Sequence, residues 1–124
     1  IGSSVSSIGE SAFENCSGFT GSLTIPNSVK SIGVQAFYGC YSLIGTLTIG
    51  RSVESIADGA FYECVRLFEV INLSGLDIVK GATTHGYAAY YAMTVKDSGP
   101  ASEIVNYGDF IFFISDFCMF INVF

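Results

Sequence analysis

The sequence repeats itself at a fixed period of 24 residues. Eight apolar positions recur in three successive units, and the columns begin at Val5, Ile8, Ala12, Phe13, Cys16, Phe19, Leu23 and Ile25. A strict period places Ile71 and Leu73 at the ends of the last two columns. Such a pattern, with variable residues between the columns, is typical of identical units stacked around one shared interior. The repeat therefore predicts a solenoid.

The middle unit shows how one coil is expected to run. Residues 22–25 alternate outward and inward, as in a half-buried strand, and residues 29–32 form a second short extended segment. Within residues 34–41, Phe37 and Cys40 have a spacing that suits a single helical or 3₁₀ turn pointing inward. One unit alone cannot offset its backbone entropy by burial, so neighbouring coils must cover both of its open faces.

The same stretch, LTIPNSVKSIGVQAFYGCYSL, closely resembles the BspA-type leucine-rich repeat. The flanking units IGSSVSSIGESAFENCSGF and LTIGRSVESIADGAFYECVRL match the same pattern. The resemblance implies a leucine-rich-repeat solenoid, mostly β, with parallel stacked short strands and short helical or 3₁₀ turns. It covers residues 1–75 as three repeats. It also implies a surface or secreted protein of the kind involved in adhesion.

Residues 76–124 are predicted to form a non-repeat α+β or β-hairpin segment. Residues 74–86 are predicted to form a loop, 86–93 a short helix, and 103–106, 107–115 and 117–124 strands with a turn at 115–116. The phenylalanine-rich end, residues 110–124, is expected to pack on Leu67, Ile71 and Leu73 and cap the array. Its other face would meet a following domain or a second copy. The stretch NLSGLDIVKGATTHGYAAYYA also resembles segments that separate repeat arrays in BspA-like surface proteins, so the resemblance implies an inter-array element as the alternative to a cap.

Charge excludes two classes of partner. The net charge is −6, and the five Lys and Arg residues are scattered singly, so we expect neither nucleic acid nor an anionic membrane as a partner. The apolar run 110–124 is too short to span a bilayer. Because Ile1 already fits a repeat position, the chain is expected to begin inside a larger protein, with any signal or anchor elsewhere.

Three of the four cysteines occupy one column. Parallel strands lie about 4.7 to 4.9 Å apart, farther than the roughly 3.5 to 4.5 Å between the Cβ atoms of a disulfide. We therefore expect Cys16, Cys40 and Cys64 to form a buried ladder of free thiols, with a disulfide as the alternative. Their spacing does not match a zinc site.

No catalytic motif is present. His85, the only histidine, lies in a polar loop and is expected to be solvated. Glu10, Glu14, Asp58 and Glu63 fall at coil corners, where solvated surface is the preferred interpretation and weak calcium binding the alternative. We therefore predict no enzyme activity, no cofactor and no metal site.

The outward side chains of the first strand of each coil are the candidate binding surface. They are Ser22, Thr24, Thr46, Thr48, Val70 and Asn72. Small and mostly hydroxyl-bearing side chains suit hydrogen bonding to an extended partner or a glycan. With the resemblance, this predicts a cell-surface or secreted adhesion module that binds a host or cell-surface protein or glycan. The alternative is a structural spacer that carries a binding domain elsewhere in the chain.

Overall fold

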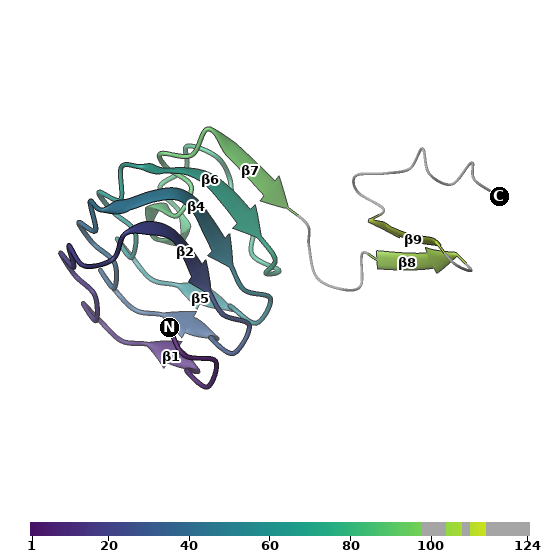
Figure 1. The fold of residues 1–124 in the computed structure, drawn as a ribbon, viewed down its shortest axis with the longest axis horizontal. Coiled ribbons are helices and arrows are strands. Elements are labelled where there is room, and N and C mark those ends of the chain that lie inside the picture. Colours follow the sequence, from purple (N-terminus) through teal and green to yellow (C-terminus); the bar gives the residue numbers. More distant parts are fainter. Residues whose placement is uncertain (98–103, 108–109, 114–124) are drawn as a thin grey trace.

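The computed structural model describes residues 1–97, 104–107 and 110–113. Residues 1–97 form a parallel-strand solenoid of about 4 turns (Figure 1), which confirms the predicted leucine-rich-repeat architecture. Each coil contributes one strand to a four-stranded parallel sheet in the order β2 (Gly21–Ile25), β4 (Leu43–Ile49), β6 (Leu67–Asn72) and β7 (Thr94–Asp97).

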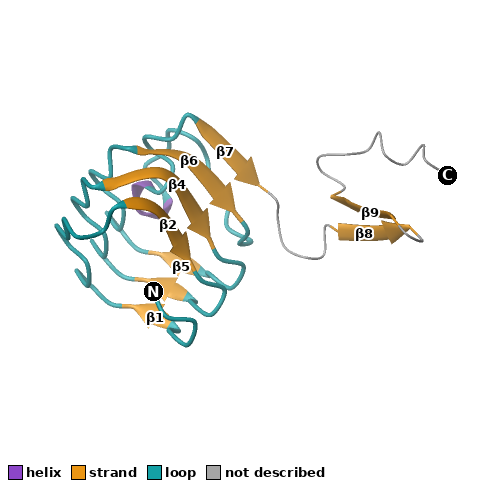
Figure 2. Ribbon diagram, viewed as in Figure 1, coloured by secondary structure: helices purple, strands orange, loops and turns teal. Residues whose placement is uncertain are grey.

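A second parallel sheet lies across the core from the first (Figure 2). It contains three two-residue strands in the order β1 (Ser7–Ile8), β3 (Ser31–Ile32) and β5 (Ser55–Ile56). The pairs Ile8–Ile32 and Ile32–Ile56 are in register, so the isoleucine column of the repeat becomes one row of inward side chains. The tight turns between the sheets close the third side of each coil.

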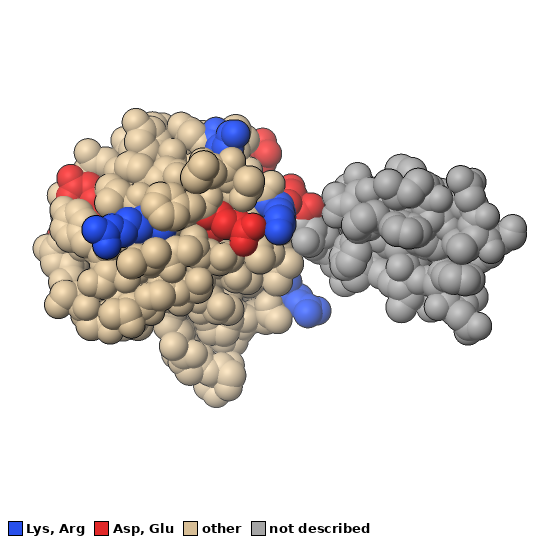
Figure 3. Space-filling view, turned by 45° about the horizontal axis from the view of Figure 1, so that its top comes forward, with Lys and Arg blue, Asp and Glu red and all other residues tan. Residues whose placement is uncertain are grey.

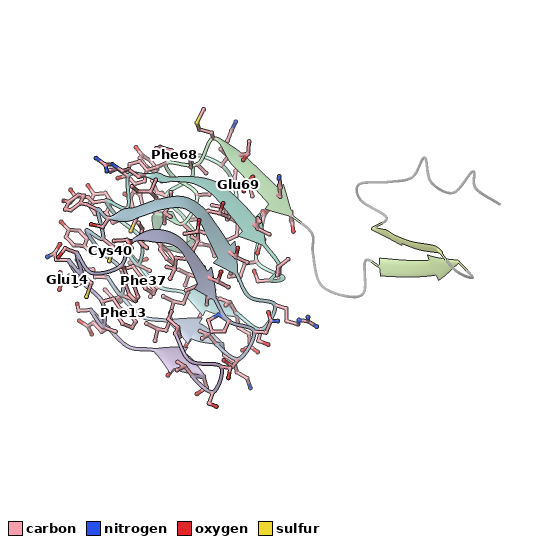
Figure 4. The ribbon with its side chains drawn as sticks, in the orientation of Figure 1. Phe13, Glu14, Phe37, Cys40, Phe68 and Glu69 are labelled. Carbon is pink, nitrogen blue, oxygen red and sulfur yellow. The ribbon has the colours of Figure 1, made fainter. Side chains whose placement is uncertain are left out.

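The phenylalanine column fills the centre of the solenoid (Figure 4). Phe37 is fully buried, and its ring stacks on those of Phe13 and Phe61 with centroid distances of 5.2 Å on each side. Phe13, in the first coil, is only half-buried and also contacts Phe19 at 4.8 Å. The central coil therefore carries the most completely packed ring of the column.

A ladder of hydrogen bonds connects the turns of each coil to those of the next coil. The backbone N–H groups of Phe13, Phe37 and Phe61 each donate to the next coil at 2.7 Å. The thiols continue the ladder, because Cys40 Sγ donates to the carbonyl of Phe13 and Cys64 Sγ to that of Phe37, both at 3.0 Å.

The prediction of free thiols in the cysteine column is confirmed, and two of the three are buried as expected. Cys16, Cys40 and Cys64 are free thiols, and the last two are buried. Cys16 is only partly covered, because no coil lies over it among the described residues. Burial raises the pKa of Cys40 and raises the pKa of Cys64 to about 12.

The strict 24-residue register is wrong for the third coil. Leu47 pairs with Val70 and Ile49 with Asn72, so the third coil is one residue shorter than the second between Leu67 and Val70. A shift of one residue moves every following side chain to the other face of a strand. Val70 and Asn72 are consequently buried, whereas Ile71, expected inside, lies on the outer face and is half-buried.

Asn72 replaces a core isoleucine, and its side chain makes three hydrogen bonds. Its Nδ2 donates to the carbonyl of Leu76 at 2.8 Å, and its Oδ1 accepts from the backbone N–H of Ser74 at 3.0 Å and from the Ser74 hydroxyl at 2.5 Å. A buried amide without these partners would carry a large desolvation cost. The side chain therefore holds the turn that leaves β6.

The sequence analysis expected the array to end at residue 75, but the array continues beyond it. β7 pairs in parallel with β6, from Glu69–Thr94 to Asn72–Asp97, and forms the strand of a fourth coil. Residues 76–97 thus cover the third coil, and Ile78, Ala88, Ala89 and Ala92 are the buried side chains of this segment. The apolar residues of this coil do not follow the 24-residue period, so the sequence repeat did not reveal it.

The predicted helix at 86–93 is wrong. The structure has only a 3₁₀ turn, η1 (His85–Tyr87), and His85, Gly86 and Tyr87 all have positive φ, so the turn is left-handed. Glycine is required at its centre, because a Cβ on Gly86 would lie 2.5 Å from the carbonyl oxygen of Ala57. This close approach lets the Gly86 carbonyl accept from Phe61 and continue the ladder.

The rest of the tail contains one described hairpin. β8 (Ile104–Tyr107) and β9 (Phe110–Phe113) pair antiparallel, so Tyr107 of the predicted strand 107–115 belongs to one strand and residues 110–113 to another. The predicted turn at 115–116 and strand 117–124 lie outside the described residues. The packing of the tail on Leu67, Ile71 and Leu73 remains a prediction.

Candidate functional site

The outer face of the four-stranded sheet presents two rows of side chains. Pairing in the sheet aligns Thr46, Glu69 and Thr94 in one row. It aligns Thr24, Thr48, Ile71 and Lys96 in the other. We call this surface the sheet face; Ser22 belongs to its first row.

Four of the six predicted binding residues lie on the sheet face. Ser22 and Thr24 are exposed, and Thr46 and Thr48 are half-buried. Val70 and Asn72 are buried in the core and are removed from the candidate surface, because the shortened third coil turns them inward. Glu69 and Ile71 occupy the outward positions instead, and Thr94 and Lys96 extend the rows onto the fourth coil.

Part of the hydrogen-bonding capacity of this face is used internally. Ser22 Oγ accepts from the backbone N–H of Thr46, and Thr46 Oγ1 donates to Glu69, both at 3.0 Å. Lys96 Nζ lies 3.1 Å from Glu69, and its hydrogen bond, followed by that of Thr46, lowers the pKa of the Glu69 carboxyl. Among the described residues, the hydroxyl groups of Thr24, Thr48 and Thr94 do not take part in this network.

A second surface, absent from the sequence predictions, runs along the turn side of the solenoid. Six of the seven tyrosines gather there: Tyr38, Tyr41, Tyr62, Tyr87, Tyr90 and Tyr91. Five of the rings form an unbroken chain with centroid distances of 5.6, 4.7, 5.0 and 4.9 Å. We call this surface the tyrosine stripe.

Glu63 lies within the tyrosine stripe. The Tyr41 hydroxyl donates to its carboxylate at 2.6 Å, and this bond raises the pKa of Tyr41 to about 12. The negative charge of Glu63 also raises the pKa of Tyr38, with a smaller contribution from Glu14. The phenol groups of Tyr38 and Tyr41 therefore lose their protons less readily than a free tyrosine does.

The sequence contained a signal for this stripe. Glu14, Tyr38 and Tyr62 lie at equivalent positions of three coils, next to the phenylalanine column. Tyr87, Tyr90 and Tyr91 carry no such periodicity and join the stripe only because the fourth coil stacks on the third. Figure 4 shows Glu14 at the turn edge and Glu69 on the sheet, so the two surfaces are distinct.

The remaining polar candidates do not form a catalytic arrangement in the described part of the chain. His85 is half-buried rather than solvated, and its Nδ1 is enclosed without a hydrogen-bond partner. Glu10, Glu14 and Asp58 are exposed, as expected for solvated corners. Among the described residues, no group of His, Cys, Asp and Glu side chains is arranged to hold a metal ion.

One shallow hollow of about 270 Å³ lies on the first coil. Phe13, Cys16, Gly18 and Phe19 line it. Phe13, Cys16 and Phe19 belong to the core columns, and their equivalents in the second and third coils are buried. The hollow is therefore the uncovered core layer of the first coil.

None of the described helical segments is long and apolar enough to cross a bilayer.

Comparison with known proteins agrees with the fold. A family model described as "BspA type Leucine rich repeat region (6 copies)" matches residues 1–115, beyond the fourth coil of the structure. Searches of curated proteins and of solved structures found no match. Repeat solenoids of this kind are generally used for binding rather than catalysis. Because the matched region covers most of the chain, and the structure is the corresponding solenoid, this protein belongs to the BspA-type leucine-rich repeat family.

Proposed function

We propose that this chain is a non-enzymatic adhesion module, displayed at a cell surface or secreted, that binds a host or cell-surface protein or glycan through the sheet face. The observation that carries the proposal is the continuity of this face across four coils, from the exposed Ser22 and Thr24 to the exposed Thr94 and Lys96. A stack of parallel strands holds such rows at a fixed spacing, which suits an extended partner.

The chemistry of the face favours hydrogen bonding over capture by charge. Its first two coils contribute only hydroxyl side chains, and its acidic and basic groups, Glu69 and Lys96, neutralise each other. Figure 3 shows charged side chains only in small, separate groups on the visible surface of the solenoid. Polar complementarity of this kind sets partner choice more than it sets affinity.

Two single substitutions test the face. Thr24→Glu and Thr48→Glu each add a charge to the second row and leave the core unchanged. They are made separately, because the two residues are cross-strand partners and paired glutamates would repel each other. Binding is measured on an array of matrix proteins and glycans, with far-ultraviolet circular dichroism to show that folding survives.

Ser55→Glu is the matched control. Ser55 is also a short hydroxyl side chain and is exposed, as Thr24 is, but it lies on β5 of the other sheet. We expect the threonine variants to lose binding and the control to retain it. Equal binding by all three variants would contradict the proposal, and an absence of any ligand on the array would support the spacer interpretation instead. Labelling of intact cells with an antibody to the chain tests its surface location.

A further inference from the structure

We propose that the tyrosine stripe is a second binding site, which takes an extended protein segment bearing lysine or arginine side chains. It lies on the turn side of the solenoid and is independent of the sheet face, so this inference goes beyond the proposed function and stands or fails separately.

The first argument is the exposure of a continuous aromatic surface. Tyr41 is 53% exposed, Tyr90 42% and Tyr62 37%. The rings of Tyr62 and Tyr90 also contact other rings of the stripe, and the Tyr41 hydroxyl is held by its hydrogen bond to Glu63. Rings held against one another lose little conformational entropy when a partner binds. Tyrosine is also among the residues most enriched at the energetic centres of protein interfaces.

The second argument is charge. Glu63 accepts a hydrogen bond from Tyr41, yet neither Glu63 nor Glu14 forms an ion pair with any lysine, arginine or histidine that the structure describes. Glu69, on the sheet face, does have such a partner in Lys96. The stripe therefore presents carboxylates beside aromatic rings, and none of the described lysine, arginine or histidine side chains forms an ion pair with them.

Aromatic faces and carboxylates attract the same kind of group. The face of a phenol ring carries negative potential and attracts ammonium and guanidinium ions placed over it. A guanidinium can stack on a ring while it donates hydrogen bonds to a neighbouring carboxylate. The net charge of −6 would further favour the approach of a basic segment.

The dimensions also match a short extended segment. Four ring-to-ring steps of 4.7 to 5.6 Å separate Tyr38 from Tyr91 along the chain of rings. An extended chain advances about 3.3 Å per residue, with alternate side chains on the same side. The chain of rings therefore spans at most the length of about six extended residues, and a segment of that length can carry a basic side chain at every second position.

The test uses the full 124-residue chain and a fluorescein-labelled peptide of alternating glycine and arginine. Peptides with glutamine or glutamate in place of arginine are the matched probes. Fluorescence anisotropy measures binding. A second readout is available, because the chain has no tryptophan and six of its seven tyrosines lie in the stripe, so intrinsic tyrosine emission should change when the peptide binds.

Two variants locate the site. Glu63→Gln removes the charge but retains an oxygen that can accept from Tyr41, and Tyr62→Ala interrupts the chain of rings. We expect each variant to weaken binding of the arginine peptide by about 3-fold to 30-fold, the range of one cation–aromatic or charge contact. Thr24→Glu on the sheet face should not weaken it. High salt should weaken binding to the wild-type chain.

Three results would overturn the proposal: no binding of the arginine peptide, equal binding of the glutamine peptide, or unchanged binding by both stripe variants. A stripe that binds neutral oligosaccharides, with no effect of salt or of Glu63→Gln, would likewise show that its partner is a glycan and not a basic segment. Circular dichroism of each variant verifies folding. Tyr62→Phe keeps the ring and should restore binding if Tyr62→Ala has lost only the aromatic contact.

Discussion

The replacement of Phe37 by alanine gives the most direct test of how the solenoid is held together. Phe37 is fully buried and stacks on one ring in each neighbouring coil, at 5.2 Å on both sides. Truncation of a buried phenylalanine to alanine costs about 3 to 5 kcal/mol. The two aromatic pairs each add about 0.5 to 1.5 kcal/mol beyond the area they bury. We therefore expect a loss at the upper end of the range, near 5 kcal/mol.

A loss of this size approaches the whole stability of many domains, which is about 5 to 15 kcal/mol. The consequence should be larger than for an equivalent change at an end of the array, because the central coil joins the coils on either side. Phe37→Ala is thus expected either to unfold the chain at 37 °C or to shift its urea midpoint strongly. Phe37→Leu, which keeps most of the buried volume, should cost about 2 kcal/mol.

Phe13→Ala is the matched control. Phe13 belongs to the same column, but it is half-buried and has a stacked neighbour on one side only. We expect it to lose about half as much free energy as Phe37→Ala, since the transfer contribution scales with the area removed from water. Urea unfolding followed by circular dichroism and by tyrosine emission measures both. If Phe37→Ala lost less than about 1 kcal/mol, or no more than Phe13→Ala, the stacked-ring explanation would be wrong.

The remaining predictions concern three other contacts. Native alkylation should modify the half-buried Cys16 first and leave Cys64 unmodified, because burial raises the pKa of Cys64 to about 12 and only the thiolate reacts; equal rates would contradict this. Asn72→Ala should cost about 2 to 4 kcal/mol in urea unfolding, since it leaves buried backbone groups of the turn unpaired. Gly86→Ala should destabilise more than Gly81→Ala, because both glycines have positive φ but only a Cβ on Gly86 would clash; equal thermal midpoints would contradict the close packing of the fourth coil.

Periodicity was enough to predict the solenoid. Inward columns such as Ile8, Ile32 and Ile56 are set by local alternation and by the spacing of the turns, and both can be read from one chain. The free thiols of the cysteine column followed from the spacing of parallel strands alone. These features depend on residues that are near neighbours in sequence or lie one period apart.

Tertiary structure decided which side chains form the two candidate binding surfaces. One missing residue before Val70 turned Val70 and Asn72 inward and brought Glu69 and Ile71 to the sheet face. The sequence allowed either register for this strand, and strand pairing selected between them, because burial in a shared core tolerates only one face. The buried Asn72 is stable there only through partners supplied by the turn that follows.

The tyrosine stripe shows the same limit. Tyr38 and Tyr62 share a column, whereas Tyr87 and Tyr90 come from a coil whose spacing follows no period. Their rings meet because Gly86 lets that coil approach the third closely, with its carbonyl accepting from Phe61. The repeat by itself determined the stacked core, but the outer surfaces were decided by strand register and coil stacking, which depend on contacts between residues that no local pattern relates.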